Sequence, residues 1–425
     1  MKKIYGFIAT SMLLLGINTN AQSQFKFLNQ GFGTSVLGIN DTGNGFSGGA
    51  YYNFENHTLT LKENIVGGIA SVNNNGEYAG STFLDQENYI FQPAYKKNGE
   101  WNPIPWFEES DPSNSQFTVY KISENGIWVV GQMSIGQSNF GIFAYNTQTN
   151  EMKRIVGGSF ENYSAYSINN NGIIVGWGDL PQQGTQRVPI WIDVNDMIPH
   201  QIVESVNILN GANSINTNNV IVGDNNGQPF IYKKDTNEFR ILEKPAGAIT
   251  ASFIAISDTN IMVGFANMGG NTRKAIIYHE SMGDTPVYLS DWMAEKGIEN
   301  TSTDQTLGTA ATISPNGKYI GGFNNATMAA FAQGWVLYLD DQILNTSQVD
   351  TSKISFYPNP VINTLTINTI DKVNTVEIYD TTGRLVSKQK NLKTKTLDLS
   401  NLKTGVYLLK VEIGNKFHTE KFIKK

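Results

Sequence analysis

The chain has 425 residues, of which 40% are hydrophobic and 16% charged, and it contains no cysteine. The length suggests two or three domains, and the lack of cysteine excludes disulfides, thiol nucleophiles and zinc–thiolate or iron–sulfur sites. Residues 22–352 carry a net charge of −15, and residues 353–425 carry a net charge of +7. The acidic main part argues against a nucleic-acid partner. The change in the sign of the charge predicts a domain boundary near residue 350.

The first 21 residues have the pattern of a secretory signal peptide. Two lysines precede an apolar run from Ile8 to Ile17, and the small residues Thr19 and Ala21 predict cleavage before Gln22. That run is too short to cross a bilayer, and no later stretch is long and apolar enough to do so. The sequence therefore predicts an exported protein without a transmembrane segment.

A short pattern recurs along residues 22–340. It consists of an apolar residue, polar turn residues, Gly or Asn, a short β-branched run and a closing Gly, as in SINNNGIIVG from Ser167. Because Asn and Gly tolerate positive φ at least cost, the pattern predicts a hairpin whose second strand ends or bulges at the closing Gly. The seven copies have as their apolar anchors Ile39, Val72, Ile122, Ile168, Ile215, Ile256 and Ile313.

The spacing of these anchors predicts a β-propeller. Successive anchors lie 33, 50, 46, 47, 41 and 57 residues apart, in or near the range of roughly 40–50 residues for one propeller blade. A third strand follows each hairpin, as in FGIFAYN from Phe140, and a fourth often comes next, as in EMKRIV from Glu151. Four strands per repeat and seven repeats predict an all-β chain with a seven-bladed β-propeller over residues 22–340.

The two ends of the repeat region predict how the ring closes. The last repeat lacks a fourth strand, and FKFLN at residues 25–29 precedes the first anchor without a blade of its own. Pairing that segment with the last blade would remove both open sheet edges. We expect the loops between the second and third strands to share one face, with those of blades 4, 6 and 7 the longest, together with the insert from Ser290 to Leu307. Because loops on a rigid scaffold carry function, this is the expected binding face.

The repeats have a counterpart among known families. The pattern S-I-N-x-x-G-x-I-V-G, followed by strands similar to A-F-I-Y, resembles secreted bacterial repeats named for a His-Ala-Phe tripeptide, over residues 25–340. YLSDWMAEKGI leading to AATISPNGKYIGGF is similar to the last repeats of such proteins. The tripeptide itself is absent, since the chain has Ile-Phe-Ala, Pro-Phe-Ile and Ala-Ile-Ile at those places. The resemblance implies a propeller and no particular reaction.

A second domain is expected at residues 354–425, after a polar linker at 341–353. Alternating apolar residues and short turns predict a small Ig-like β-sandwich. The YPNP motif, the IYDTTGRLV hairpin, LKTGVYLLKV and the final KFIKK resemble the C-terminal sorting domain of type IX secretion cargo. The residues that carry this sorting signal are Tyr357, Pro358, Asn359, Pro360, Gly383, Gly405, Tyr407, Lys421, Lys424 and Lys425.

This resemblance implies a route and a destination. The partners would be the type IX secretion machinery and a surface sortase, which removes the domain by cleavage between about Asp341 and Ser355. The mature protein would then be secreted or attached to the outer-membrane surface.

The sequence offers little evidence of catalysis. The four histidines do not have a metal-binding spacing, and there is no GxSxG nucleophile elbow, so neither a metal nor another cofactor is expected. Asp179, Asp224 and Asp304 fall in predicted loops. A pair of carboxylates for glycoside hydrolysis would have to lie roughly 5–9 Å apart, a distance that a sequence leaves open.

Tryptophan usage gives the candidate binding residues. Trp177 follows a closing Gly where the second strand opens into the loop GDLPQQGTQRVP, and amphipathic aromatics beside polar groups suit sugar or protein recognition. The other interpretation, which we favour for Trp177, is packing against the neighbouring blade. The candidate binding residues are Trp177, Asp179, Arg187 and Trp292.

Together these patterns predict a secreted or surface-attached binding protein whose loop face recognises a glycan or a protein. The alternatives are an extracellular polysaccharide hydrolase or lyase on the same scaffold, and a passive surface or adhesive component. Two or more carboxylates with Arg or Tyr at the mouth of the central channel would favour the enzyme. Clustered, exposed Trp and Tyr without such carboxylates would favour binding, and neither arrangement would favour the passive role.

Overall fold

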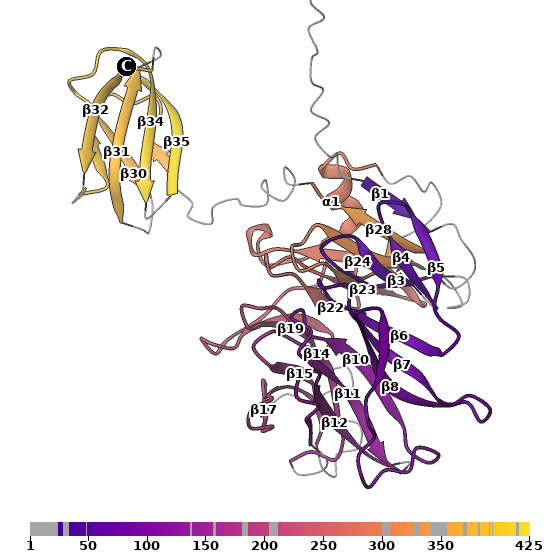
Figure 1. The fold of residues 1–425 in the computed structure, drawn as a ribbon. Coiled ribbons are helices and arrows are strands. Elements are labelled where there is room, and N and C mark those ends of the chain that lie inside the picture. The colour runs from indigo at the N-terminus through magenta and orange to yellow at the C-terminus, as the bar shows by residue number, and fades with distance from the viewer. Residues whose placement is uncertain are drawn as a thin grey trace, which may run out of the picture. The chain divides into compact units, whose positions relative to one another are not determined.

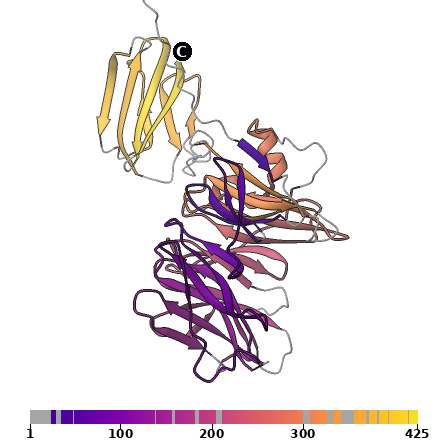
Figure 2. The same ribbon diagram turned by 45° about the vertical axis from the view of Figure 1, so that its right-hand side comes forward.

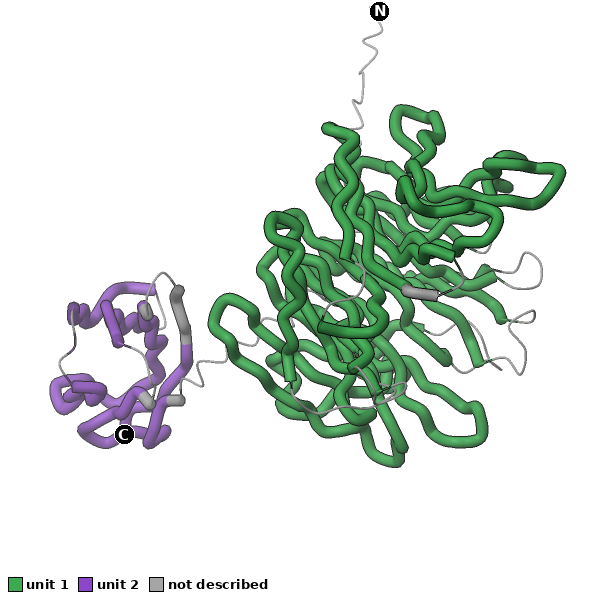
Figure 3. Tube along the Cα trace, turned by 90° about the horizontal axis from the view of Figure 1, so that it is seen from below, with its two compact units in different colours: residues 1–347 green, residues 348–425 purple. Residues whose placement is uncertain are grey.

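The chain divides into two compact units, residues 1–347 and 348–425 (Figure 3). The expected signal peptide and the linker at 341–353 lie outside the described residues. The computed structural model describes residues 24–28, 34–47, 49–136, 138–155, 159–180, 186–203, 211–299, 307–325, 332–340, 355–368, 372–380, 383–390, 392, 394–413 and 416–425.

The first unit is built from four-stranded antiparallel sheets, seven of them within the described residues. In six of these sheets every strand pairs with the next one along the chain, as the repeat pattern predicts. Sheet 1 consists of β2 (Val36–Ile39), β3 (Asn44–Ser47), β4 (Ala50–Asn53) and β5 (Thr58–Leu61). Sheet 2 consists of β6 (Val66–Val72), β7 (Tyr78–Asp85), β8 (Ile90–Lys97) and β9 (Glu100–Pro103).

The next four sheets continue in the same order. Sheet 3 consists of β10 (Phe117–Ile122), β11 (Trp128–Ile135), β12 (Ser138–Asn146) and β13 (Met152–Ile155). Sheet 4 consists of β14 (Tyr163–Ile168), β15 (Ile173–Asp179), β16 (Arg187–Asp193) and β17 (Pro199–Gln201). Sheet 5 consists of β18 (Gly211–Ile215), β19 (Val220–Asn225), β20 (Gln228–Lys233) and β21 (Glu238–Ile241). Sheet 6 consists of β22 (Thr250–Ile256), β23 (Met262–Gly269), β24 (Thr272–Tyr278) and β25 (Val287–Tyr288), with the short helix η1 (Glu280–Met282) before β25 and α1 (Leu289–Glu295) after it.

Sheet 7 joins the two ends of the first unit. It consists of β26 (Leu307–Ile313), β27 (Tyr319–Asn324), β28 (Gly334–Tyr338) and, beside β28, the N-terminal strand β1 (Gln24–Phe27). β1 runs antiparallel to β28, with Phe27 opposite Trp335, and the indigo strand lies beside the orange one in Figures 1 and 2. The predicted pairing of the FKFLN segment with the last repeat is therefore confirmed.

The seven sheets pack in a ring. Each sheet contacts the next, and β2 of sheet 1 contacts both β6 of sheet 2 and β26 of sheet 7. The ring of His57 in sheet 1 lies with Nε2 2.9 Å from the carbonyl oxygen of Phe27, which adds a contact between sheets 1 and 7. Four-stranded sheets that pack in cyclic order give a propeller-like fold.

The residue after each anchor closes the hairpin turn. Its carbonyl accepts a hydrogen bond from the backbone N–H three residues on, as between Asn169 and Gly172 at 3.2 Å. The residue that donates this bond has a positive φ in every copy, so a turn is followed by one left-handed residue. These left-handed residues are Gly43, Gly76, Gly126, Gly172, Asn219, Asn260 and Gly317.

The closing Gly has a more specific cause than the sequence predicted. The second strand runs past it, since β15 continues beyond Gly176 to Asp179, and the bulge lies in the first strand, between Ala165 and Ser167. A Cβ on Gly176 would lie 1.8 Å from the carbonyl oxygen of Ser164. The same clash recurs at the equivalent glycines of five other sheets, Gly80, Gly131, Gly223, Gly264 and Gly322, whereas sheet 1 has Ser47 opposite its bulge.

Four of the turn residues also link neighbouring sheets. In each of these an Asn side-chain amide donates to the backbone carbonyl of the turn residue in the next sheet, while its Oδ1 accepts from its own turn. Each of these Asn residues is at least 97% buried. The bonds run from Asn40 to Asn73 at 3.0 Å, from Asn73 to Ser123 at 3.2 Å, from Asn169 to Asn216 at 2.9 Å, and from Asn216 to Ser257 at 3.0 Å.

The remaining three sheets carry Ser at this position. The hydroxyls of Ser123, Ser257 and Ser314 accept hydrogen bonds from backbone N–H groups of their own turns, at 3.0 Å in each case. A Ser side chain has no amide to reach the next sheet. The sequence pattern therefore combines two functions, turn closure and sheet linkage, of which Ser supplies only the first.

The second unit is a sandwich of two sheets. One buried cluster of apolar residues lies between the two sheets and includes Val361, Leu365, Ile378 and Leu409. The three-stranded sheet has β29 (Ser355–Tyr357), β30 (Thr364–Asn368) and β33 (Thr396–Asp398), and the four-stranded sheet has β32 (Leu385–Lys390), β31 (Val373–Asp380), β34 (Gly405–Ile413) and β35 (Lys416–Lys424) in that spatial order.

Candidate functional site

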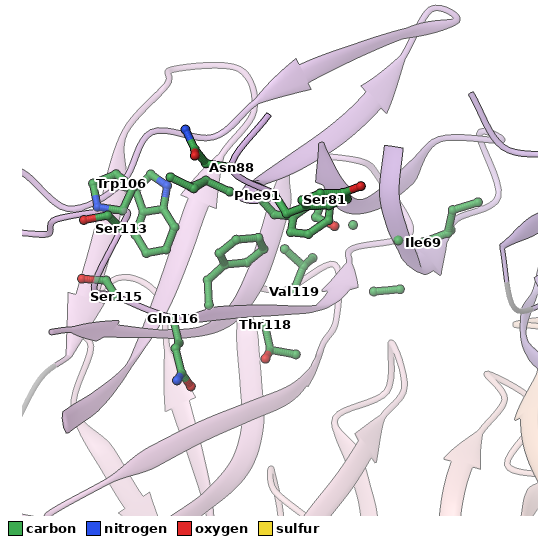
Figure 4. Close-up of a pocket in the computed structure, with 17 residues that line it drawn as sticks. Ile69, Ser81, Asn88, Phe91, Trp106, Ser113, Ser115, Gln116, Thr118 and Val119 are labelled. Atoms are coloured by element: carbon green, nitrogen blue, oxygen red, sulfur yellow. The ribbon is translucent and has the colours of Figure 1, made fainter. Parts of the chain in front are cut away.

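An open cleft of about 630 Å³ lies between sheets 2 and 3. Its floor comes from β6, β7 and β10. One wall is the hairpin that connects β7 to β8, and the other is the long connection from β9 to β10. Figure 4 shows side chains from both walls, with Asn88 and Phe91 on one and Trp106 and Ser113 on the other.

The first wall is shaped by a side-chain-capped turn. Oδ1 of Asp85 accepts hydrogen bonds from the backbone N–H groups of Glu87 at 3.0 Å and Asn88 at 3.1 Å, which fixes the hairpin tip. Tyr89 follows with φ 56°, a left-handed conformation that is unusual for a bulky residue. Its side chain is 75% exposed. The turn thus holds a large aromatic ring at the rim of the cleft.

Two phenylalanines support this ring. The ring of Tyr89 meets that of Phe83 edge-on, with centroids 6.1 Å apart. Phe83 in turn packs against Phe91 at 4.4 Å. The wall is therefore a row of three aromatic rings in contact, Phe91, Phe83 and Tyr89, with the exposed Tyr89 at its end.

The opposite wall carries Trp106. Its ring packs edge-on against Phe117 of β10, with centroids 5.3 Å apart. The indole Nε1 is buried and has no hydrogen-bond partner within the described residues. Buried N–H donors nearly always have a partner, so this donor is an exception, and it lies closed off from solvent within the wall. Ser113 and Ser115 lie near it, whereas Gln116 and Thr118 point away from it in Figure 4.

The lining of the cleft is uncharged. The residues that contribute to it are aromatic, aliphatic, glycine or proline, or carry a neutral hydroxyl or amide, and none of those that the structure describes there is Asp, Glu, Lys, Arg or His. The described residues also contain no group of three or more His, Asp or Glu side chains that could hold a metal ion. The arrangement suits recognition by ring contacts and neutral hydrogen bonds.

Three of the sequence-predicted site residues come together elsewhere, between sheets 4 and 5. Trp177 is only 7% exposed, and its Nε1 donates to the hydroxyl of Tyr166 at 2.8 Å. The guanidinium of Arg187 lies 3.8 Å from the centre of the Trp177 ring, and its Nε lies 3.6 Å from Oδ1 of Asp179. Trp177 is thus buried among these groups, as the packing interpretation expects.

Burial also raises the pKa values of two carboxyl groups in this region, those of Asp179 and Asp224. Burial raises the pKa of Asp179, although the charge of Arg187 opposes this shift. Asp224 of β19 accepts a hydrogen bond at Oδ2 from the hydroxyl of Ser252 at 2.9 Å. Its Oδ1 is buried without a hydrogen-bond partner among the described residues, and burial raises its pKa to about 7.

Trp292 is separated from that group. It lies in α1 and is 6% exposed, packed in the core cluster that contains Trp335 and Met293. The structure therefore gives Trp292 a role in anchoring the connection between sheets 6 and 7. Because Trp292 is buried in this cluster, its ring is not exposed at the surface for binding.

The central channel is lined by the bulged residue of each first strand. The open space among these strands is about 410 Å³, and Lys121 and Glu124 also line it. Tyr120 and Tyr166 meet edge-on at 5.2 Å on one side, while the remaining bulge residues are small, apolar or amide-bearing. The seven bulge residues are Leu37, Ala70, Tyr120, Tyr166, Asn213, Ile254 and Ala311.

The prediction of long loops was wrong for the sixth repeat. Strands β23 and β24 are joined by a tight turn at Gly270 and Asn271, both with positive φ. Parts of the corresponding loops of sheets 4 and 7, residues 181–185 and 326–331, lie outside the described residues. The insert from Ser290 to Leu307 begins as helix α1 and connects two sheets instead of two strands of one sheet.

The sequence patterns did not indicate the residues of the cleft. Tyr89 and Trp106 stand in two separate connections, and neither belongs to the recurring pattern. The signal that could have found them is the segment IPWFEESDPSNSQ at residues 104–116, which joins sheets 2 and 3 through an unusually long stretch rich in Ser and Pro.

The sorting-signal residues have identifiable structural roles. The amide of Asn359 donates to the carbonyl of Lys421 at 3.1 Å and its Oδ1 accepts from the N–H of Ile423 at 2.9 Å, so the YPNP motif is joined to β35. The hydroxyl of Tyr407 donates to the carbonyl of Lys403 at 2.9 Å, as in the tyrosine corner of Ig-like sandwiches.

The other residues of this set occupy turns and ends. Gly383 has φ 82° in the turn between β31 and β32, and Gly405 begins β34. Tyr357 is 52% exposed and Lys424 is buried. Pro358 and Pro360 flank Asn359 in the motif, and Lys421 and Lys425 are exposed in and after β35.

The chain has distant likenesses among solved structures. The extracellular domain of a hybrid two-component system from B. thetaiotaomicron gives a TM-score of 0.46 at 13% identity, covering 95% of this chain and 57% of that one. A second such domain from the same organism gives 0.43 at 11% identity, covering 96% and 60%. The chain thus spans less than two thirds of the length of these domains. No curated protein sequence matches the chain.

The C-terminal unit does match a known family. Residues 355–425 fit the family described as the secretion system C-terminal sorting domain, in agreement with the motifs from Tyr357 onward. Among the described residues, no helix has the length and apolar character needed to cross a bilayer. The chain therefore carries a type IX sorting domain, which directs it to be secreted or attached to the outer-membrane surface.

Proposed function

We propose that the chain is a surface-attached or secreted binding protein built on a seven-bladed β-propeller, and that the cleft between sheets 2 and 3 recognises a glycan or a protein. The seven cyclically packed sheets support the blade number. The sorting domain supports display outside the cell, where such a ligand would be met.

One observation carries the proposal. Tyr89 is held in a left-handed conformation with its ring 75% exposed at the rim of the cleft. A bulky residue with positive φ is strained, and such strain is concentrated at functional sites.

The proposal extends to the route of export. Residues 1–21 would be removed as a signal peptide, and residues 354–425 by a surface sortase that cuts between about Asp341 and Ser355. The first unit would then remain on the surface or be released. The relation to His-Ala-Phe-type repeats belongs to the same proposal and is supported by the seven equivalent turns.

A second candidate function rests on Asp179 and Asp224. Two buried carboxylates near Tyr166 and Arg187 are the kind of group that an extracellular polysaccharide hydrolase or lyase would need. Both are more than 90% buried, and neither lines the cleft. Release of reducing ends from polysaccharides by the purified chain, lost in Asp224→Asn, would favour this candidate over binding.

Binding is tested with the mature chain from residue 22. The labelled protein is applied to a glycan array and to an array of uncharged peptides, and the hits are compared between wild type and Tyr89→Ala. The matched control is Leu61→Ala, because Leu61 is 84% exposed on β5 and lies outside the cleft. Loss of the hits in Tyr89→Ala alone supports the cleft. Hits that Tyr89→Ala leaves unchanged contradict it, and the absence of any hit favours the passive surface role.

A further inference from the structure

The cleft lies in an acidic protein but is itself uncharged. Residues 22–352 carry a net charge of −15, so an anionic ligand would approach against the field of the whole unit. A cationic ligand would find no carboxylate among the described lining residues. The lining itself therefore offers no charged partner to a charged ligand.

The acidic residues nearest the rim are engaged locally. Asp85 accepts hydrogen bonds from its own hairpin, including the amide of Asn88 at 2.7 Å. Asp111 accepts from the hydroxyl of Ser113 at 2.7 Å. Glu109 forms a two-pronged ion pair with Arg154, with nitrogen–oxygen distances of 2.7 and 2.6 Å. These carboxylates shape the loops and already have partners of their own.

The two walls offer ring faces and neutral polar groups side by side. Tyr89 and Trp106 supply amphipathic aromatic surface, and Ser81, Asn88, Ser113 and Ser115 supply hydroxyl and amide groups. A sugar ring has an apolar face of C–H groups and a rim of hydroxyls, so it matches both at once. A fully apolar ligand would leave the polar groups without partners, at a cost of about 1–3 kcal/mol for each one that becomes buried.

A peptide fits the same cleft less well. Peptides that bind by strand addition need an unpaired strand edge. Strand β7 is paired with β6 and β8, and β8 is paired with β7 and β9, so these two lining strands have no free edge, whereas the lining strands β6 and β10 are paired on one side only. Along β7 and β8, recognition has to come from side chains, which favours a ligand that carries many neutral hydroxyls.

We infer that the ligand is a neutral carbohydrate chain, bound with one sugar ring against Tyr89 and another part of the chain near Trp106. This inference rests on the proposed function, because it names the ligand class of the same cleft. The volume of about 630 Å³ is within the range of small-ligand sites, so a short segment of a longer polysaccharide fills it.

The test is calorimetric titration of the mature chain with defined oligosaccharides. The probes are hexasaccharides of β-1,4-glucan, β-1,3-glucan, α-1,4-glucan and β-1,4-mannan, with an oligogalacturonate as the anionic arm, a chitosan oligomer as the cationic arm, and uncharged peptides as the protein arm. The variants are Tyr89→Ala, Tyr89→Phe and Leu61→Ala. Since Tyr89 is largely exposed, its replacement leaves the fold intact, which circular dichroism checks.

We expect at least one neutral hexasaccharide to bind, and Tyr89→Ala to weaken it about tenfold, equivalent to about 1.4 kcal/mol. Tyr89→Phe keeps the ring and retains most of the affinity, and Leu61→Ala binds like the wild type. Preference for the charged oligomers or for a peptide, with the same dependence on Tyr89, overturns the ligand class and leaves the cleft as the site. A neutral sugar that binds Tyr89→Ala as tightly as the wild type overturns the cleft itself. Absence of binding to every neutral hexasaccharide at about 10 mM, weaker than millimolar affinity, overturns the ligand class.

Discussion

The links between sheets can be tested by replacing one asparagine with the residue that three sheets already carry. The amide of Asn216 donates to the carbonyl of Ser257 at 3.0 Å and to Oδ1 of Asn260 at 2.8 Å. Its Oδ1 accepts from the N–H groups of Asn218 at 3.1 Å and Val220 at 3.0 Å. Asn216→Ser keeps a hydroxyl that can accept within the turn, as Ser257 does, but removes both bonds of the amide.

The expected loss follows from the number of bonds. A buried hydrogen bond contributes about 0.5–1.5 kcal/mol net, so losing two should lower the free energy of unfolding by about 1–3 kcal/mol. Asn216→Ala also leaves the turn N–H groups without an acceptor and should cost about 1–3 kcal/mol more. The variants should therefore rank wild type, Ser and Ala in decreasing stability.

The assay is urea unfolding of the mature chain followed by tryptophan fluorescence. All seven tryptophans lie in the first unit, so the signal reports that unit alone. Asn195→Ser, at an exposed position in sheet 4, serves as the control and should change stability by no more than about 0.5 kcal/mol. If Asn216→Ser matched this control, the amide bonds between sheets would have no measurable part in holding the ring together.

Four further outcomes follow from the structure. Deleting residues 22–30 removes β1 from sheet 7, so the thermal midpoint should fall by many degrees, and an unchanged midpoint would contradict ring closure. Trp177→Ala should cost about 3–5 kcal/mol, as for a buried aromatic, in urea unfolding; a change below about 0.5 kcal/mol would contradict its packing role. Burial raises the pKa of Asp224 in the folded chain from 3.8 to about 7. As pH rises, Asp224 therefore ionises first in the unfolded chain, and the free energy of unfolding falls across that interval. Asp224→Asn should stabilise the protein by up to about 4 kcal/mol at about pH 8 and not at about pH 3, and equal effects at both pH values would refute this. Deleting residues 353–425 should leave the protein in the periplasm, and its detection by surface labelling or in the medium would count against the role of the sorting domain.

The repeat architecture could be predicted because each cause lies within one short segment. The turn after Ile168 needs Gly172 in a left-handed conformation, and the bulge in β14 needs Gly176 opposite it. Both requirements leave residues at fixed spacing, so the strand order and the pairing of β1 could be inferred. The sorting domain was recognisable for a similar reason, since the bonds of Asn359 lie within one small unit.

The candidate site could not be predicted, because it depends on which segments meet in space. Trp177 stands at the mouth of a long loop, but Arg187 covers its ring and Tyr166 takes its indole N–H. Tyr89 and Trp106 come from connections without any repeat pattern, and only the packing of sheets 2 and 3 brings them to one cleft. The sequence pattern explains the turn asparagines by their tolerance of positive φ, whereas Asn216 acts mainly through the hydrogen bonds of its side-chain amide.

The most direct test of the cleft is hydrogen–deuterium exchange of the mature chain with and without the neutral hexasaccharide that binds most tightly. Ligand bound between the two walls should slow exchange of the backbone amides in residues 85–92 and 104–116, and leave the strands around the central channel unchanged. Protection confined to the first strands that line the channel, or to the group around Trp177, would contradict the assignment of the cleft as the binding site.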